Sequence, residues 1–221
     1  GESGVGTAIL GKKKGYDVFV SDFGKIKENY REVLIINGIQ WEDEQHTEDL
    51  ILNADVVMKS PGIPEKAPII KKLLEKNVSV ISEIEFAAQF TNAITIGITG
   101  SNGKTIIKEW LYQVLEKDYS IAKSPGSYNS QIGVPLSVWN LDTWHTLGIF
   151  EAGISKPGEM LHLEQIIQPT IGILTFMGEA HSEGFESLSQ KIKEKLILFN
   201  NANQLVYCCD DESLQIEITA W

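Results

Sequence analysis

One strand–turn–helix segment constrains the fold of this chain more than any other stretch. Residues 94–115 read ITIGITGSNGKTIIKEWLYQVL, in which an apolar, β-branched run meets a Gly-Ser-Asn-Gly-Lys-Thr turn and a helical pattern follows at once. Glycines let the backbone of such a turn point several N–H groups at one anion, and the helix adds the positive end of its dipole. The segment therefore predicts a phosphate-binding loop in an α/β fold.

Each loop position can be given a chemical role. The side chain of Lys104 would place a positive charge on the terminal phosphates of a nucleotide, and the Thr105 hydroxyl would bind Mg²⁺. A further glycine is usual at the position where Ile98 stands, so the loop is a shortened variant of the pattern. The predicted cofactor-binding residues are consecutive: Gly100, Ser101, Asn102, Gly103, Lys104 and Thr105.

Strands and helices alternate on both sides of this loop, which predicts βαβ units and mostly parallel sheets. We expect two α/β domains, residues 1–92 and 93–221. Strand-like stretches are YDVFVSD, ADVVMKSPG, TIGITG, TLGIFEAG, TIGILTF and QLVYCC, and VSVISEIEF reads as a strand running into a helix. Helices are expected in APIIKKLLEKN and near residues 106–117, 157–167 and 187–201.

Charge and cysteine content limit the kinds of partner. The formal net charge of −11 argues against a nucleic acid or a membrane surface, because both would repel an acidic protein. A small phosphate ligand is still compatible, since backbone N–H groups can bind it locally. The adjacent Cys208 and Cys209 show no metal-binding spacing and favour reduced thiols in a cytosolic protein. No apolar run reaches the ~20 residues of a membrane span.

The amino terminus offers a second glycine pattern with a different meaning. GESGVG is similar to a dinucleotide-type glycine turn, and Asp22 ends the next predicted strand at a distance typical of a ribose-binding acid. The spacing of Gly1, Gly4 and Gly6 departs from G-x-G-x-x-G, and the strand that should precede the turn is missing, which could leave the sheet imperfect. A nicotinamide-dependent oxidoreductase is the alternative function that this pattern would support.

Several stretches together resemble the Mur ligases, the ATP-dependent enzymes that build the peptidoglycan stem peptide. TGSNGKT has the form of their ATP loop. From about residue 99, the stretches SPGSYNSQIGVPLSVW, IFEAGISKPGEM and TFMGEAHSEGFESLSQKIKEKLILF resemble the central domain of the members that add D-alanyl-D-alanine. Residues 1 to about 98, including ADVVMKSPGIP and VISEIEF, resemble the UDP-binding domain of the members that add D-glutamate. A hybrid joined at the loop would explain both resemblances.

The resemblance implies a Rossmann-like UDP-binding domain, a central parallel-sheet ATP-binding domain, and the absence of the third domain that family members carry. It implies an ATP-dependent ligase that joins D-glutamate to UDP-N-acetylmuramoyl-L-alanine through an acyl phosphate. The alternatives are D-alanyl-D-alanine addition to the UDP-tripeptide, or a catalytically incomplete chain that only binds nucleotide. The implied cofactors are ATP, two Mg²⁺ ions and a carbamylated lysine. We further expect a monomer in the bacterial cytoplasm, with UDP-N-acetylmuramoyl-peptide and amino-acid substrates and no nucleic-acid or membrane partner.

Catalytic and metal-binding residues follow from matching this sequence to the family. Glu151 ends an apolar strand, where a carboxylate can bind Mg²⁺. His181 lies in the loop after TIGILTF, where a neutral imidazole could complete a metal shell. Lys195 stands where the family has a lysine that becomes a carbamate, although it, Lys191 and Lys193 read by themselves as a solvated helix face. The residues predicted to be catalytic are Lys104, His181, Lys195 and Asn129, and those predicted to bind metal are Thr105, Glu151, His181 and Lys195.

The nucleotide-sugar site is predicted in the amino-terminal domain. By resemblance to the D-glutamate-adding ligases, the glycine turn would contact the diphosphate and Asp22 would contact the UDP group. A Ser-Pro-Gly turn at residues 60–62 would assist. The predicted substrate-binding residues are Ser3, Gly4, Asp22 and Gly62.

Overall fold

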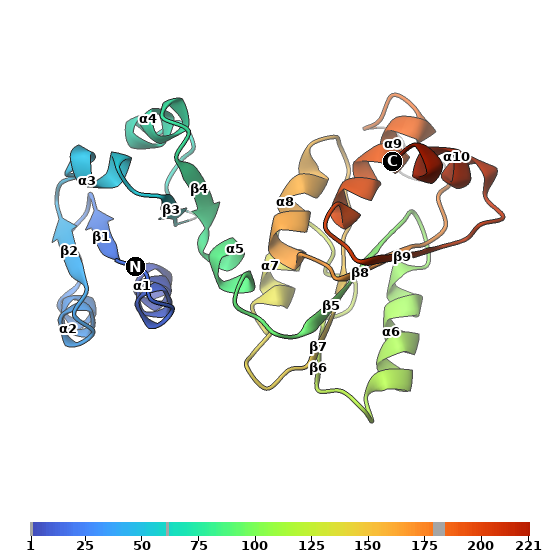
Figure 1. The fold of residues 1–221 in the computed structure, drawn as a ribbon, viewed down its shortest axis with the longest axis horizontal. Coiled ribbons are helices and arrows are strands. Elements are labelled where there is room, and N and C mark those ends of the chain that lie inside the picture. The colour runs from blue at the N-terminus through green and yellow to red at the C-terminus, as the bar shows by residue number, and fades with distance from the viewer. Residues whose placement is uncertain (1, 61, 179–183) are drawn as a thin grey trace. The chain divides into compact units, whose positions relative to one another are not determined.

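The computed structural model describes residues 2–60, 62–178 and 184–221 (Figure 1). The chain divides into two compact units, Gly1–Gln89 and Phe90–Trp221. The division falls just before the boundary expected between residues 92 and 93. Both units are built from alternating strands and helices, in agreement with the predicted α/β class.

The first unit contains short strands joined by helices. Its strands are β1 (Phe19–Asp22), β2 (Gln40–Asp43), β3 (Val56–Lys59) and β4 (Ser79–Ser82). Its helices are α1 (Glu2–Lys13), α2 (Glu28–Ile36), α3 (Glu48–Leu52), α4 (Pro68–Glu75) and α5 (Glu83–Ala88).

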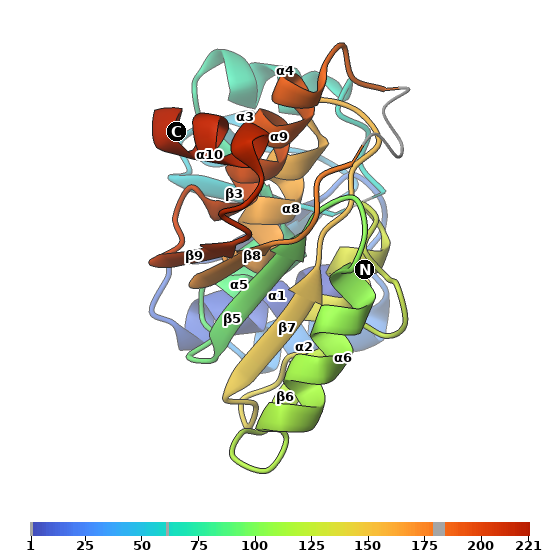
Figure 2. The ribbon, with the colours of Figure 1, turned by 90° about the vertical axis from the view of Figure 1, so that its right-hand side faces the viewer.

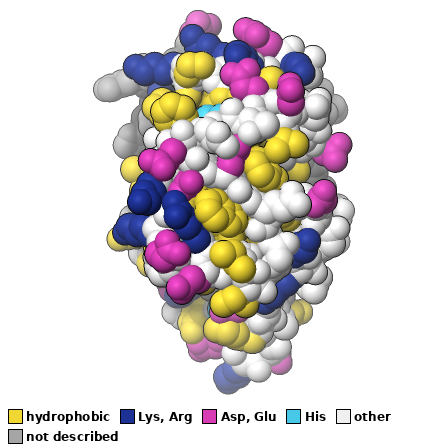
Figure 3. All heavy atoms as spheres, turned by 90° about the vertical axis from the view of Figure 1, so that its left-hand side faces the viewer, with side chains coloured by type: hydrophobic (Ala, Val, Ile, Leu, Met, Phe, Trp, Pro, Cys, Tyr) yellow, Lys and Arg dark blue, Asp and Glu magenta, His cyan; other side chains and the backbone are white. Residues whose placement is uncertain are grey.

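The strands of the first unit form two separate parallel pairs, β1 with β2 and β3 with β4. The strands of this unit that the structure describes thus do not form one continuous sheet. A small core of Val5, Ala8, Ile26, Leu34 and Ile39 joins α1 and α2 to the first strand pair. Basic, acidic and hydrophobic side chains are intermingled on the face of this unit shown in Figure 3.

The interpretation of GESGVG as a glycine turn is wrong. In the structure α1 begins at Glu2, so Gly4 and Gly6 lie within a helix. A glycine in a helix interior costs about 1 kcal/mol relative to alanine, but Val5 and Ala8 of the same helix are buried in the core of the unit. Tertiary packing therefore outweighs the local preference, and the pattern that supported a nicotinamide-dependent enzyme is not present.

The second unit carries the larger sheet. Its strands are β5 (Ile94–Thr99), β6 (Ile121–Lys123), β7 (Leu147–Glu151), β8 (Ile171–Leu174) and β9 (Gln204–Tyr207). Its helices are α6 (Lys104–Leu115), α7 (Gly133–Val138), α8 (Glu159–Ile167), α9 (Leu188–Leu196), the 3₁₀ helix η1 (Ile197–Phe199) and α10 (Glu212–Ala220).

This sheet is parallel throughout, with strand order β6-β7-β5-β8-β9. Strand β5 lies in the centre and runs directly into the glycine loop (Figure 2). In open parallel sheets, ligands bind beyond the carboxyl ends of the strands, near the point where the strand order reverses. The central position of β5 therefore places residues 100–103 at the edge where a site is expected.

The alternation of side chains along the strands explains how the sheet is covered. Ile96 and Ile98 of β5 pack, together with β7 and β8, against Ile107 and Leu111 of α6. Gly97, which lies between them, would have a Cβ 3.5 Å from Leu198 of η1, on the other face. Helix α6 thus covers one face of the sheet, and η1 approaches the other face where glycine leaves room.

No helix in the described ranges is both long and apolar enough to cross a membrane.

Candidate functional site

The loop between β5 and α6 is shaped by two glycines with positive φ angles. Gly100 has φ of +151° and Gly103 has φ of +88°. A Cβ at Gly100 would overlap the hydroxyl oxygen of Thr175, so this position has no space for another residue. Position 100 requires glycine because the Thr175 hydroxyl lies too close for a Cβ, and position 103 favours glycine because its φ angle is positive.

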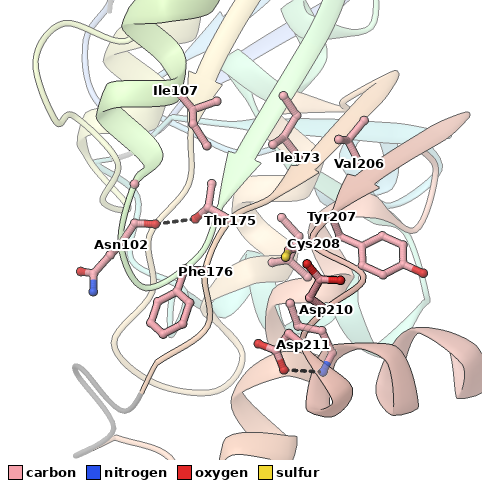
Figure 4. Close-up of a pocket in the computed structure, with 13 residues that line it drawn as sticks. Asn102, Ile107, Ile173, Thr175, Phe176, Val206, Tyr207, Cys208, Asp210 and Asp211 are labelled. Atoms are coloured by element: carbon pink, nitrogen blue, oxygen red, sulfur yellow. Dashed lines mark hydrogen bonds between the residues drawn. The ribbon is translucent and has the colours of Figure 1, made fainter.

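The loop is fastened to the segment that follows β8. The Ser101 amide donates to Phe176 O at 2.9 Å, and the Ser101 hydroxyl donates to Gly178 O at 3.1 Å. The Thr175 hydroxyl donates to Asn102 O at 2.7 Å, as the dashed line in Figure 4 shows. These bonds hold the loop against the segment after β8, and none of them uses the N–H groups of residues 102–104.

Several amide groups of the loop point to no protein acceptor. Within the described residues, the N–H groups of Asn102, Gly103 and Lys104 make no hydrogen bond. Lys104 is also the first residue of α6, where the helix leaves its first amides unpaired. Unpaired N–H groups at a helix amino terminus form a suitable site for a phosphate group.

Two lysine side chains meet at one oxygen of the loop. Lys104 Nζ donates to Gly100 O at 2.9 Å, and Lys195 Nζ donates to the same oxygen at 3.3 Å. Lys195 comes from α9, far along the chain, and its ammonium also lies 3.5 Å from the Thr99 hydroxyl. Two like charges at one carbonyl repel each other unless an anion lies nearby, so this arrangement favours a phosphate ligand.

The pKa values of these lysines are lowered by their surroundings. Burial, together with the charges of Lys104 and Lys191, lowers the pKa of Lys195 to about 7. Burial also lowers the pKa of Lys104, and the nearby Glu151 carboxylate partly opposes that shift. A lysine with a pKa near 7 is partly a neutral amine at physiological pH, which is the form that reacts with electrophiles.

The interpretation of α9 as a solvated face is wrong for two of its three lysines. Lys191 and Lys195 lie one helical turn apart and are only 2% and 3% exposed. The ammonium of Lys191 donates to Gly178 O at 3.0 Å, and burial lowers its pKa. The side chain of Lys193, on the opposite side of the helix, is 65% exposed. Helix α9 therefore directs two cations inward, toward the loop segments.

Glu151 and Thr105 come together at the carboxyl end of β7. The Thr105 hydroxyl donates to Glu151 Oε2 at 3.0 Å, and the Glu151 side chain is completely buried. Its other oxygen, Oε1, has no hydrogen bond of good geometry among the described residues. Oε1 also lies 2.9 Å from the ammonium of Lys108. A buried carboxylate beside a hydroxyl supplies oxygen ligands of the kind that a hard divalent cation such as Mg²⁺ takes. The described residues contain no cluster of three or more His, Cys, Asp or Glu side chains, so the remaining ligands would have to come from elsewhere.

Asn129 lies beside the segment that leaves β7. Its carbonyl oxygen accepts a hydrogen bond of 2.7 Å from the Gly153 amide. A Cβ at Gly153 would be only 2.9 Å from Asn129 Oδ1, so the asparagine side chain rests directly on this glycine. The structure thus brings Asn129 next to the strand end that carries Glu151.

A hollow adjoins the loop on the side of Asn102 and Gly103. Its volume is about 820 Å³, and its walls come from the ends of β8 and β9 and from the start of α10 (Figure 4). The lining is mostly apolar and includes Ile173, Phe176 and Val206, with Asp210 and Asp211 at one side. A ligand whose phosphates occupy the loop could extend into this space.

The predicted nucleotide-sugar residues lie in the first unit. A Cβ at Gly4 would be 3.8 Å from Ser60 Oγ and 3.6 Å from Glu83 Oε1, so the start of α1 approaches the turn that contains Gly62. Asp22 ends β1, and its carboxylate accepts a hydrogen bond of 2.9 Å from the Gly24 amide.

Some predicted positions lie outside the part that the structure describes. His181 belongs to them, and so does the side chain of Ser3. Conversely, Lys108 is not among the predicted site residues, although its side chain is completely buried and its ammonium lies beside the Glu151 carboxylate. A signal existed, because Lys108 lies at helical spacing from the apolar Leu111 and Leu115 of α6.

Two family models match the sequence of this chain. Residues 98–220 match the Mur ligase middle domain, and residues 7–69 match the MurD N-terminal domain. The chain belongs to the Mur ligase family.

Relatives of this Mur ligase chain are named for one reaction step, the addition of D-glutamate to UDP-N-acetylmuramoylalanine. The chain is 44% identical over 228 aligned residues to the UDP-N-acetylmuramoylalanine–D-glutamate ligase of Christiangramia forsetii, which covers all of the chain and 48% of that protein. It is 53% identical over 116 residues to the ligase of the same name from Bacteroides thetaiotaomicron, covering 52% of the chain and 26% of that protein. The chain spans about half the length of the Christiangramia relative.

A solved structure shows the same fold. The MurF ligase of Thermotoga maritima in complex with ADP superposes with a TM-score of 0.58 at 25% identity, covering 95% of this chain and 47% of that protein. Members of the family are ATP-dependent ligases, so a phosphate loop in the middle domain is an expected feature of this Mur ligase chain.

Proposed function

We propose that this chain forms the substrate- and ATP-binding part of a ligase that joins D-glutamate to UDP-N-acetylmuramoyl-L-alanine. The observation that carries the proposal is the meeting of Lys104 and Lys195 at Gly100 O, next to loop amides without protein acceptors. This arrangement provides positive charge and N–H donors in a chain whose net charge is −11. Such a site suits the triphosphate of ATP.

The reaction we propose activates a carboxylate before the amide forms. The γ-phosphoryl group of ATP moves to the carboxylate of the L-alanyl residue, which yields an acyl phosphate and ADP. The amine of D-glutamate then attacks the acyl carbon, and phosphate leaves as the amide bond forms. Phosphoryl transfer depends mainly on positioning and on stabilisation of charge, which are the roles we assign to Lys104 and the loop amides.

Mg²⁺ is the metal that the family implies, and Thr105 with Glu151 would hold it. When bound, it would neutralise charge on the phosphate oxygens. Lys195 would hold a second ion only as a carbamate, which forms when its neutral amine bonds to the carbon of CO₂ and releases a proton. The lowered pKa of Lys195, about 7, supports this step because it increases the neutral fraction.

The D-glutamate step is favoured over its rival by the similarity of the whole chain to one D-glutamate ligase. A hybrid origin is therefore not required to explain why both units resemble Mur ligases. D-Alanyl-D-alanine addition is the second candidate, because the solved MurF ligase that shares the fold is 25% identical. We propose the predicted roles also for His181, Asn129 and the nucleotide-sugar residues Ser3, Gly4, Asp22 and Gly62. Ser3 and Gly4 would then act from the first turn of α1 and not from a glycine turn.

A binding titration tests the nucleotide assignment. The full chain is titrated with ADP and Mg²⁺ by calorimetry, alongside Lys104→Met and, as a control on an exposed lysine, Lys193→Met. We expect wild type and Lys193→Met to bind ADP equally and Lys104→Met to bind at least about tenfold more weakly. Binding of NADH without any binding of ADP would refute the proposal.

A further inference from the structure

Lys108 is a buried cation to which the proposed reaction gives no task. It lies one turn after Lys104 in α6, and both its side chain and that of Glu151 are 0% exposed. Lysine is almost never fully buried unless it is paired. The groups that contact its ammonium must therefore compensate for the loss of water around the buried charge.

Those partners come from separate parts of the sheet edge. Lys108 Nζ donates to Ser124 O at 2.8 Å and to Gly126 O, both in the segment after β6. The same nitrogen lies 2.9 Å from Glu151 Oε1 at the end of β7. It also lies 3.2 Å from a carboxylate oxygen of Glu109, a residue with a partly exposed side chain. Lys108 thus ties α6 to the ends of two neighbouring strands.

The Lys108 ammonium offsets the negative charge of Glu151 without making a well-aligned hydrogen bond to its carboxylate. Glu151 Oε1 is close to the ammonium, yet it has no hydrogen bond of good geometry among the described residues. The ammonium is therefore paired with this oxygen by charge and not by a well-aligned hydrogen bond. Glu151 Oε2 is held by the Thr105 hydroxyl at 3.0 Å, so both oxygens are fixed in place.

This arrangement affects how a divalent cation can bind. A buried carboxylate attracts a metal ion strongly, but an ammonium 2.9 Å away cancels most of that attraction. Lys104 adds further positive charge near Glu151. A metal ion that arrives alone therefore meets a site without net negative charge, whereas one that arrives with a nucleotide brings the phosphate charges along.

We propose that Lys108 is the resident counter-ion and positioning residue of Glu151, and that it makes divalent metal binding at Glu151 and Thr105 depend on nucleotide phosphates. Lys108 holds the carboxylate beside the Thr105 hydroxyl and balances its charge while no ligand is bound. The proposal rests on the proposed function for the identity of the nucleotide only.

Manganese binding provides the direct test. Free Mn²⁺ is measured by electron paramagnetic resonance during titration of the full chain, with and without ADP. We expect wild type to bind Mn²⁺ at least about tenfold more tightly with ADP than without it, and Lys108→Met to bind Mn²⁺ without ADP at least about tenfold more tightly than wild type does in the same condition. The matched control is Lys123→Met, which removes a lysine of β6 that pairs with Glu109 of α6. This variant should behave as wild type.

A gain of metal affinity separates this role from a merely structural one, because loss of structure can only weaken binding. Unchanged or weaker Mn²⁺ binding by Lys108→Met in the absence of ADP would overturn the proposal. Failure of wild type to bind ADP would refute the proposed function instead, and the comparison without nucleotide would still report on Lys108.

Thermal unfolding of a double-mutant cycle supplies a second measurement. Lys108→Met and Glu151→Gln each remove one partner of the buried pair and should lower the melting temperature by roughly 10 °C. The double variant should lose several degrees less than the sum of the single losses. If Lys108→Met does not fold, the double variant should still fold. Additive losses, or a double variant that also fails to fold, would contradict the pairing.

Discussion

Lys104 and Lys195 donate to the same carbonyl oxygen, that of Gly100, although α9 and α6 are distant in sequence. Their burial lowers both pKa values, and for Lys195 the value reaches about 7. A protein keeps buried cations together when a ligand or a modification compensates their charge. At the scale of single residues, the site is therefore prepared to receive negative charge.

Carbamylation of Lys195 is the first prediction at this scale. In buffer containing ¹³C-labelled bicarbonate, the chain should show a carbamate ¹³C signal, because the neutral amine of Lys195 is available near pH 7. Lys195→Gln should remove the signal, and Lys193→Gln, which changes an exposed lysine of the same helix, should keep it. A signal that survives Lys195→Gln would assign the modification to another residue.

The pH dependence of stability is the second prediction. The pKa of Lys195 is about 7 in the folded chain and near its ordinary 10.5 after unfolding. Between these values the unfolded chain binds more protons, so Lys195 makes the free energy of unfolding rise with pH from about 7 to 10.5. Denaturant unfolding in CO₂-free buffer should show this rise in wild type relative to Lys195→Met. A difference that is flat or falls with pH would contradict the burial of the charge.

Residues whose chemistry follows from their position along the chain can be predicted from the sequence. Lys104, Thr105 and Glu151 were predicted because each lies at a strand end or helix start, and the parallel sheet brings those ends together. Lys108 and Lys191 were not predicted. The helical spacing of Lys108 from apolar residues is a weak signal, because a long lysine side chain can also reach solvent from such a position, and tertiary packing decides which occurs.

At the scale of elements, the β5–α6 loop depends on its fit against the segment after β8. Gly100→Ala would bring a Cβ into the Thr175 hydroxyl at a positive φ of +151°. We expect this change to abolish ADP binding and to lower the free energy of unfolding by about 2–4 kcal/mol. Calorimetric titration and denaturant unfolding measure the two effects.

Gly158→Ala is the matched control for that experiment. Gly158 also has a positive φ, +85°, but a Cβ there would meet nothing within 4 Å. It should cost only about 1 kcal/mol for the backbone conformation and leave ADP binding unchanged. Equal effects of the two substitutions would show that strain alone, and not the contact with Thr175, governs the loop.

The elements that sequence patterns predicted well are the apolar strands and the helices with clear periodicity. The expected strands at TIGITG, TLGIFEAG and TIGILTF correspond to β5, β7 and β8. The glycines of α1 suggest a turn, whereas packing of α1 in the core around Leu34 stabilises a helix. Strand β6 was not predicted, because it has only three residues and is defined by pairing with β7.

At the scale of the whole molecule, each unit carries one part of the proposed chemistry. The second unit contains the glycine loop and the buried lysines. In the first unit, Gly4 of α1 lies close to Ser60, which follows β3. The chain carries a net charge of −11, yet two lysines, Lys104 and Lys195, meet at the loop. We propose that the first unit selects the UDP-peptide and the second unit selects the nucleotide.

The measurement that tests the central claim most directly is a comparison of two UDP-peptides. The full chain is titrated with UDP-N-acetylmuramoyl-L-alanine and, separately, with the corresponding UDP-tripeptide, in the presence of ADP and Mg²⁺. A D-glutamate-adding ligase should bind the L-alanyl form at least about tenfold more tightly. Clear preference for the UDP-tripeptide would contradict the account and assign the chain to D-alanyl-D-alanine addition.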